Sequence, residues 1–558
     1  MKKEVYLDLM EQVVSVYTPQ QIENYIAQVK DRGIWEHGFP RLGANIGILM
    51  AHGRLLHLRN YFVEIMDLCC AQIPCPPTPW KHRGNDFSVR EIVCCLLELE
   101  KTDLFDRQTL ERWKSAIASV DPYKCYREIS PVPPVPKDNW AAFNAASEQA
   151  RVFAGLGDNR DFIDNQIASQ MFSFEENGMY RDPHEPMVYD VVTRVQLAAA
   201  LFFGYNGTHR EALDAFLKKA GLLTLRMQSV TGELPFGGRS NHFLHNETHL
   251  AAACEYETRR YGALGDLETA GQFRAAAKLA VESIFRWLKR NPAHHIKNYY
   301  PIYSMVGCED YAYYDKYMVT AASFLYMAYM FADDGICATT CPAMLDGVDI
   351  WQTSDHFHKL FYRKDGYFVE LERQAFSLYD ASGIGRIQRR GAPETICLAV
   401  PVSRKPNYIT DGENPCPLSI CPGVEGEDGW MFAWDENSTY RVTEATDAPA
   451  WEVTLENGAR CTQTCRITPE GVTLDTEGTG MVGLMLPAFA YDGANETRII
   501  PGENTLQICY QGWVCRYSTD GNIVDTGLRC TNRNGQYRVF RAQGREKLQV
   551  RISIYPQK

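Results

Sequence analysis

The spacing of apolar residues changes once along the chain, and this change constrains the fold more than any other feature. Through about residue 335 apolar side chains recur every three or four positions, as at 92–97, which is typical of helices with one buried face. Further on, apolar and polar residues alternate, as at 367–372, which is typical of strands. The sequence therefore predicts a helical domain over 1–335, a linker over 336–348 and an antiparallel β-domain over 349–558.

Turn residues refine this division. Pairs such as Asn457-Gly458 and Asp520-Gly521 are typical of β-hairpins, so the second half is expected to form a large antiparallel sheet or sandwich. In the first half, the spacing between the loops at Gly178 and Gly232 fits two helices with their connections. Repeated helical hairpins either stack into an open solenoid or close into an (α/α) toroid whose loops ring a cleft. The polar, aromatic-rich loops favour the toroid, and the predicted fold class is an N-terminal (α/α) toroid followed by a β-sandwich domain.

Composition limits the partners. The 57 Lys and Arg residues are outnumbered by 69 Asp and Glu residues, and the resulting net charge of −12 argues against nucleic-acid binding. No apolar run reaches ~18 residues, so no membrane helix is predicted. The charged start at Met1–Asp8 does not fit a signal peptide, and the eighteen cysteines, several of them adjacent, fit reduced thiols in the cytoplasm. Cys461 and Cys465 lack further ligands at zinc spacing, so we predict neither a structural metal nor a cofactor.

The densest group of functional side chains lies at 239–249. On a helix His245 and His249 share a face, while Glu247 points elsewhere, so the group does not match the His-Glu-x-x-His pattern of zinc proteases. The alternative for these two histidines is hydrogen bonding at a helix N-terminus. His242 precedes the helix and is a candidate catalytic group.

A second group, at 299–317, is rich in tyrosine. Tyrosine offers flat faces for sugar rings and hydroxyls for hydrogen bonds, although aromatics that fill the helical core are the alternative for Tyr313 and Tyr314. Glu309 and Asp310 are less typical of a core, because acids are seldom buried unpaired. Both groups would serve one site only if segments 231–249 and 299–317 met at a shared hollow.

Two arginines are candidates for holding a substrate carboxylate. The guanidinium groups of Arg194 and Arg239 match a carboxylate in a bidentate way, although structural salt bridges are the more common role of arginine. Asn139 and Trp140, at the head of a predicted helix, offer an amide and an aromatic ring to the rim of a cleft. A helix N-cap is the alternative for Asn139.

With these residues in view, the chain resembles carbohydrate-active enzymes that join a helical toroid to a large antiparallel β-domain. These are the heparinase II/III and alginate lyase kinds of polysaccharide lyase and, most closely, the glucuronidases of glycoside hydrolase family 154. The resemblance covers about residues 130–335 in motif and implies cleavage of a glycosidic bond next to glucuronic acid, in an oligosaccharide or glucuronide. The residues that carry it are 231–240, His242, Asn246, Glu247, Gly307, Glu309, Tyr311 and Tyr317.

The favoured function is an exo-acting, β-glucuronidase-like hydrolase. Hydrolysis needs one protonated carboxylic acid and a second carboxylate as nucleophile or base, and two of Glu233, Glu247 and Glu309 are expected to fill these roles. The acids exceed what elimination requires, which favours hydrolysis. The predicted substrate-binding residues are Arg239, Arg194, Asn241, Asn246, His245, Tyr300 and Tyr317.

Two alternatives stay open. A polysaccharide lyase would abstract the proton next to the uronate carboxylate, with His242 and Tyr311 or Tyr317 as acid and base and Asn241 as a donor. A non-catalytic carbohydrate-binding protein is the other alternative, for which more regular helical repeats are expected. In each case the β-domain is expected to close one side of the cleft and is a candidate surface for a homo-oligomer.

Overall fold

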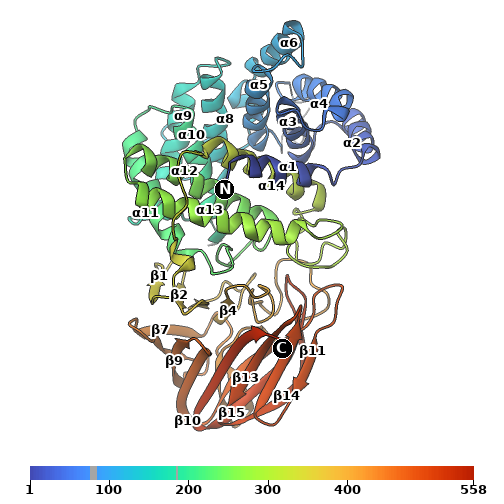
Figure 1. Cartoon of the computed structure of the whole chain (residues 1–558). Helices are drawn as coiled ribbons and strands as arrows, with labels where there is room; N and C mark the ends of the chain where they lie inside the picture. The colour runs from blue at the N-terminus through green and yellow to red at the C-terminus, as the bar shows by residue number, and fades with distance from the viewer. Residues whose placement is uncertain (76–83, 184–186, 558) are drawn as a thin grey trace.

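The computed structural model describes residues 1–75, 84–183 and 187–557. The chain forms a helical body, at the top of Figure 1, and a body of β-strands below it. The last long helix, α14, ends at Phe331, and the first strand, β1, begins at Asp349. Within the described ranges, we find no helix with the length and apolar character needed to cross a bilayer.

The helical body is a closed ring of helices inside a second, outer set. In the inner ring α3 packs on α5, α5 on α8, α8 on α10, α10 on α12 and α12 on α14, and α14 returns to α3. This closure confirms the predicted (α/α) toroid in place of an open solenoid. The inner helices are α3 (Gly38–Ala51), α5 (Val89–Leu99), α8 (Trp140–Phe153), α10 (Met187–Phe202), α12 (Leu244–Ala263) and α14 (Tyr314–Phe331).

The outer helices pack against the ring from outside. For example, α13 lies on α12, α1 on α14 and α9 on α8. Polar side chains cap their first turns: Thr18 and Gln21 form a reciprocal capping box on α2, and Asp266 accepts the backbone N–H of Thr269 at the start of α13. The outer and short helices are α1 (Glu4–Val14), α2 (Pro19–Arg32), α4 (Arg59–Gln72), α6 (Arg107–Ala118), α7 (Pro122–Cys125), α9 (Arg160–Met171), α11 (Arg210–Met227), α13 (Leu267–Leu288) and the 3₁₀ turns Leu56–Leu58, Asn85–Phe87 and Pro342–Met344.

The β-body contains two antiparallel sheets. The small sheet has the order β1-β2-β3-β4, and the large one runs β11-β12-β13-β15-β10-β9-β8-β7, with β14 paired to β15 and the β5–β6 hairpin to β10. The small sheet consists of β1 (Asp349–Gln352), β2 (Lys359–Lys364), β3 (Tyr367–Glu372) and β4 (Gly383–Arg389). The large sheet consists of β5 (Pro422–Gly426), β6 (Gly429–Phe432), β7 (Thr439–Glu444), β8 (Ala450–Thr454), β9 (Arg460–Thr468), β10 (Gly471–Tyr491), β11 (Arg498–Pro501), β12 (Thr505–Tyr510), β13 (Trp513–Thr519), β14 (Asn522–Thr531) and β15 (Gln536–Pro556).

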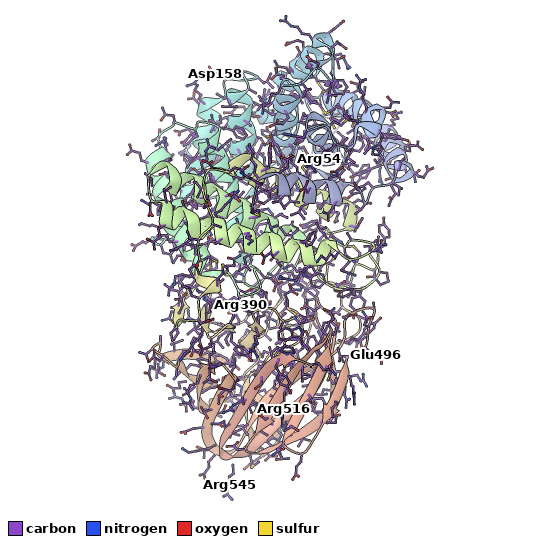
Figure 2. All side chains as sticks on the ribbon, in the orientation of Figure 1. Arg54, Asp158, Arg390, Glu496, Arg516 and Arg545 are labelled. Atoms are coloured by element: carbon purple, nitrogen blue, oxygen red, sulfur yellow. The ribbon has the colours of Figure 1, made fainter. Side chains whose placement is uncertain are left out.

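The small sheet joins the two bodies. Alternate residues of β2 face opposite ways, so Leu360 and Tyr362 join the core of the large sheet while Phe361 packs with Met187 and Met227 of the helical body. Both faces of β2 and β3 are therefore buried, which explains why their sequences carry few exposed polar positions. Side chains fill the junction in Figure 2, where Arg390 is labelled between the two bodies.

Candidate active site

A cavity lies at one mouth of the inner ring of helices. It has a volume of about 550 Å³ and is walled by residues of α3, α8, α10, α12 and α14 together with the loops before α3, α12 and α14. The lining includes Arg239 and His245 from one predicted segment and Tyr311 and Tyr317 from the other. Segments 231–249 and 299–317 therefore meet at one hollow, as their shared chemistry requires.

The loop before α12 carries Arg239 and Ser240 in a tightly held conformation. Gly238, Ser240 and His242 all have positive φ, at 71°, 54° and 70°, a region that side-chain-bearing residues seldom adopt. Hydrogen bonds hold the loop there: the Ser240 N–H donates to Glu309 at 2.7 Å, and Asn246 Nδ2 donates to the Ser240 carbonyl at 3.1 Å. The loop therefore presents its side chains to the cavity in a fixed direction.

Three tyrosine hydroxyls gather around the hydroxyl of Ser240. Its Oγ lies 3.1 Å from Tyr189 Oη, 3.1 Å from Tyr311 Oη and 3.3 Å from Tyr317 Oη. Burial raises the pKa of each phenol above its usual value, and the Ser240 contact lowers it by less. All three phenols are therefore protonated at neutral pH and can donate hydrogen bonds into the cavity.

His245 lies beside these phenols. Its ring centroid is 4.8 Å from that of Tyr317. Burial, reinforced by His249, lowers the pKa of His245 well below its usual value, so the imidazole is neutral at neutral pH. Its Nδ1 has no hydrogen-bond partner among the described residues, whereas His249 Nδ1 contacts the His245 carbonyl at 2.6 Å. A neutral imidazole can accept a proton from a bound molecule.

The wall of this cavity is positively charged, in contrast to the chain as a whole. Arg239 stacks over the Tyr189 ring at 4.3 Å and pairs with Asp182, which also accepts a hydrogen bond from Asn139 at 2.9 Å. Buried Arg41 has an Nη2 group with no partner among the described residues. Two acids line the cavity, Glu36 and Asp310. They are outnumbered by four lining cations, which are Arg41, Arg127, Arg239 and Lys316.

The three glutamates expected to catalyse hydrolysis do not line the cavity. Lys297 Nζ lies 2.8 Å from Glu233 and 2.6 Å from Glu247, and all three side chains are buried. Burial opposes ionisation of both acids. At Glu233 the charge of Lys297 outweighs the effect of burial and holds the pKa of this acid below its usual range. At Glu247 burial, together with the charge of Glu233, raises the pKa. Glu309 pairs with Arg533 at 2.7 Å.

His242, predicted to be catalytic, and several predicted binding residues also have partners outside the cavity. Arg194 pairs with Asp190 one helical turn away, at 2.6 Å. His242 contacts Asn534 of the β-body. Asn241 donates to the Pro235 carbonyl, Asn246 accepts the N–H of Phe243, and Tyr300 packs edge-on against Tyr491. None of these side chains lines the cavity; like Glu309, they support the loops around it. Asn139 and Trp140 do line the cavity, and the side chain of Asn139 does not cap α8.

Sequence reasoning did not single out the stretch at 35–37. Trp35, Glu36 and His37 line the cavity from the short loop before α3. Their signal was an aromatic, an acid and a histidine in succession between two helices, about 200 residues before the other groups. In the described part of the chain, no three His, Cys, Asp or Glu side chains gather as ligands of a metal ion would.

Comparisons with known proteins bear on the fold. No protein-family model matches the chain, and neither does any curated protein sequence. The structure of heparinase III matches with a TM-score of 0.50 and 9% identity, over 93% of this chain and 76% of that one. The chondroitin AC lyase of Streptomyces coelicolor A3, in complex with chondroitin sulphate, matches with a TM-score of 0.47 and 11% identity, over 99% and 79% of the two chains.

A β-arabinofuranosidase matches with a TM-score of 0.34 and 10% identity, over 98% of this chain and 95% of that one. At such low identity a structural match establishes the fold alone, and of these three matches heparinase III has the TM-score that reaches 0.5. The resemblance to the family 154 glucuronidases stays a prediction. The chain shares with heparinase III a fold used by carbohydrate-active enzymes, a helical toroid followed by an antiparallel β-domain.

Proposed function

We propose that this protein cleaves a glycosidic bond next to a uronic acid by β-elimination, as a polysaccharide lyase does. One observation carries the proposal: Arg239, His245 and Tyr311 line the same positively charged cavity. The glutamates that hydrolysis was expected to use are held in ion pairs with Lys297 and Arg533 instead.

Arg239, His245 and Tyr311 each have a role in this reaction. Arg239 pairs with the uronate carboxylate, which makes the C5 proton more acidic and stabilises the enolate-like intermediate. Neutral His245 accepts the C5 proton. Protonated Tyr311 donates its proton to the leaving O4 as the C4–O4 bond breaks and the C4–C5 double bond forms. The products are an unsaturated uronate and a free hydroxyl, and the proton on His245 returns to Tyr311 through solvent.

The cavity favours a substrate of several sugars. A second cavity of about 200 Å³ shares Trp35 and Tyr313 with the first, so the two hollows are neighbours across these rings. The amides of Gln21, Asn24 and Gln28 line the second one and can hydrogen-bond sugar hydroxyls. A chain that reaches both hollows is longer than the small glucuronide expected for an exo-acting glucuronidase.

Glucuronidase-like hydrolysis is the second candidate, on acids other than those predicted. Glu36 and Asp310 both line the cavity, and burial raises the pKa of Glu36 as a general acid requires. Asp310 is exposed and fits a base or nucleophile. The hydrogen bonds that Glu36 accepts from Tyr25 and from the Gly38 N–H make it a less free acid than Tyr311.

One assay with three possible outcomes distinguishes a lyase, a hydrolase and a non-catalytic carbohydrate-binding protein. The purified protein is incubated with chondroitin sulfate, heparan sulfate and a polyglucuronate, and both ultraviolet absorbance of an unsaturated uronate and new reducing ends are measured. We expect absorbance and reducing ends to rise together, and both to be lost in His245→Ala. New reducing ends without absorbance, or colour from a chromogenic β-glucuronide, would establish hydrolysis. Binding without either signal would leave a carbohydrate-binding protein.

A further inference from the structure

A separate cavity of about 310 Å³ lies at the junction of the two bodies. It is formed by the end of α13, the segment after β4 and the turn between β12 and β13, and it shares no lining residue with the central cavity. Arg390, labelled in Figure 2, immediately precedes the lining segment that begins at Gly391. The groups in this wall have no part in the proposed elimination.

Aromatic rings form one side of this junction cavity. Tyr299, Trp513 and Trp287 all line it; Tyr299 and Trp513 are partly exposed, and Trp287 is buried. The Trp287 and Tyr299 ring centroids are 5.6 Å apart, and the Arg290 guanidinium lies 4.1 Å from the Tyr299 ring. Aromatic faces of this kind pack against the C–H surface of a sugar ring.

Hydrogen-bonding groups line the same cavity. The indole Nε1–H of Trp287 is buried and has no partner among the described residues, although buried donors are almost always satisfied. Gln511, in the turn between β12 and β13, donates its amide to Tyr510 Oη at 2.9 Å, which fixes the side chain at the rim. A ligand hydroxyl or carboxylate that accepted the indole N–H would satisfy the donor.

The charged side chains that line the junction cavity indicate which kind of ligand it would bind. Arg286 and Glu394 both line the cavity and pair with each other at 2.6 Å, so their charges offset. Lys289 also lines it, is exposed, and adds a positive charge at the C-terminal end of α13. Close by, Arg290 has Nε and Nη1 groups without partners in the described chain. The excess of positive charge favours an anionic ligand.

We propose that this junction cavity is a second, non-catalytic binding site for a saccharide that carries a carboxylate or sulfate group. Trp513 and Tyr299 contact the sugar ring, the Trp287 indole donates a hydrogen bond, and Lys289 pairs with the anionic substituent. This second site consists of residues that do not line the central cavity, so it does not depend on which bond the central cavity cleaves.

Binding is measured by affinity electrophoresis in gels that contain chondroitin sulfate, heparan sulfate or uncharged dextran. The parent protein carries Arg239→Ala, which weakens binding at the central cavity. We expect Lys289→Glu and Trp513→Ala each to weaken retention by the acidic polymers about tenfold, and Trp513→Phe to restore it. Lys278→Glu, at an exposed position on the same helix, is the matched control and should leave retention unchanged.

Lys289 is exposed, so its replacement leaves the fold intact, and thermal unfolding of every variant checks this. Retention by the acidic polymers that survives both Lys289→Glu and Trp513→Ala would overturn the proposal. Loss of all retention in Arg239→Ala alone would do the same, because the central cavity would then account for all binding. Equal retention by dextran would overturn the anionic part of the assignment. The catalytic assay is independent, so a protein that produces no unsaturated uronate can still pass this test.

Discussion

Arg533 of the β-body donates a hydrogen bond at 2.7 Å to Glu309 of the helical body, and both side chains are 1% exposed. The same Glu309 oxygen accepts the N–H of Ser240 at 2.7 Å, next to the tyrosine hydroxyls. The β-body therefore supports the wall of the cavity through one buried ion pair.

Arg533→Met is expected to lower the free energy of unfolding by about 3–5 kcal/mol, because it leaves the Glu309 carboxylate buried and unpaired. Turnover should also fall, since the Ser240 loop loses its anchor. Urea denaturation measures the change. The control is Lys547→Met, which breaks an exposed pair with Glu477 and should change stability by less than about 1 kcal/mol. Equal effects from the two variants would contradict a supporting role for Arg533.

Tyr311→Phe is expected to lower kcat by about 10²–10⁴-fold, because the phenol that donates the proton to the leaving oxygen is removed while the ring remains. Stability should change little. Initial rates of unsaturated product formation test this. Tyr123→Phe, a change at a residue that is 61% exposed and lines neither the central nor the second cavity, should retain the wild-type rate. A Tyr311→Phe rate near that of the wild type would exclude this phenol as the acid.

Arg239→Ala is expected to lower kcat/KM for uronate substrates about 10- to 100-fold, because a charged hydrogen bond to the substrate carboxylate is lost. The change also removes the partner of buried Asp182, so kcat/KM is measured on the folded fraction. Arg194→Ala is the instructive comparison, since Arg194 is buried against Asp190 and does not line the cavity. Its folded fraction should keep kcat/KM while stability falls by about 3–5 kcal/mol. A selective loss of kcat/KM in Arg194→Ala would reverse the assignment.

Glu247→Gln distinguishes elimination from the hydrolysis first expected of this acid. Glu247 contacts Lys297, which keeps Glu233 as a second partner, so the variant should fold and lose about 1–3 kcal/mol of stability. If the reaction is an elimination, the Glu247→Gln protein is expected to retain turnover. A folded Glu247→Gln protein without any turnover would instead support Glu247 as a catalytic acid.

Because buried histidines are neutral in the folded protein, we predict that the free energy of unfolding falls at acidic pH. Burial lowers the pKa of His295 to about 4, below an unfolded value of about 6.5, so between these values the unfolded chain binds more protons. The stability that neutral His295 contributes is present at pH 7 and is lost as the pH falls below about 6.5. The stability difference between wild type and His295→Gln should therefore shrink by about 1.4 kcal/mol per pH unit between pH 6.5 and 4. A difference that stays constant in urea titrations across this range would contradict the prediction.

The fold could be predicted because its signals are local. Apolar spacing identified helices up to α14 and strands from β1 onward, and the glycine loops indicated repeated helical hairpins. The candidate site could be predicted in part: Arg239, His245, Tyr311 and Tyr317 were found from their density in two short stretches, and all four line one cavity. Trp35 and Glu36 were missed, since nothing local distinguishes them from other loop residues.

The sequence by itself determined the order of secondary structure, the apolar faces and the kinds of functional side chain, because each depends on residues within a few positions of one another. Only the tertiary structure decided which side chains are free to act. Glu233, Glu247 and Glu309 were good candidates in the sequence, but Lys297 and Arg533 approach them from distant segments, Arg533 from 224 residues away. An ion pair between distant residues leaves no periodic trace in the sequence, because it depends on how the toroid closes and where the β-body docks.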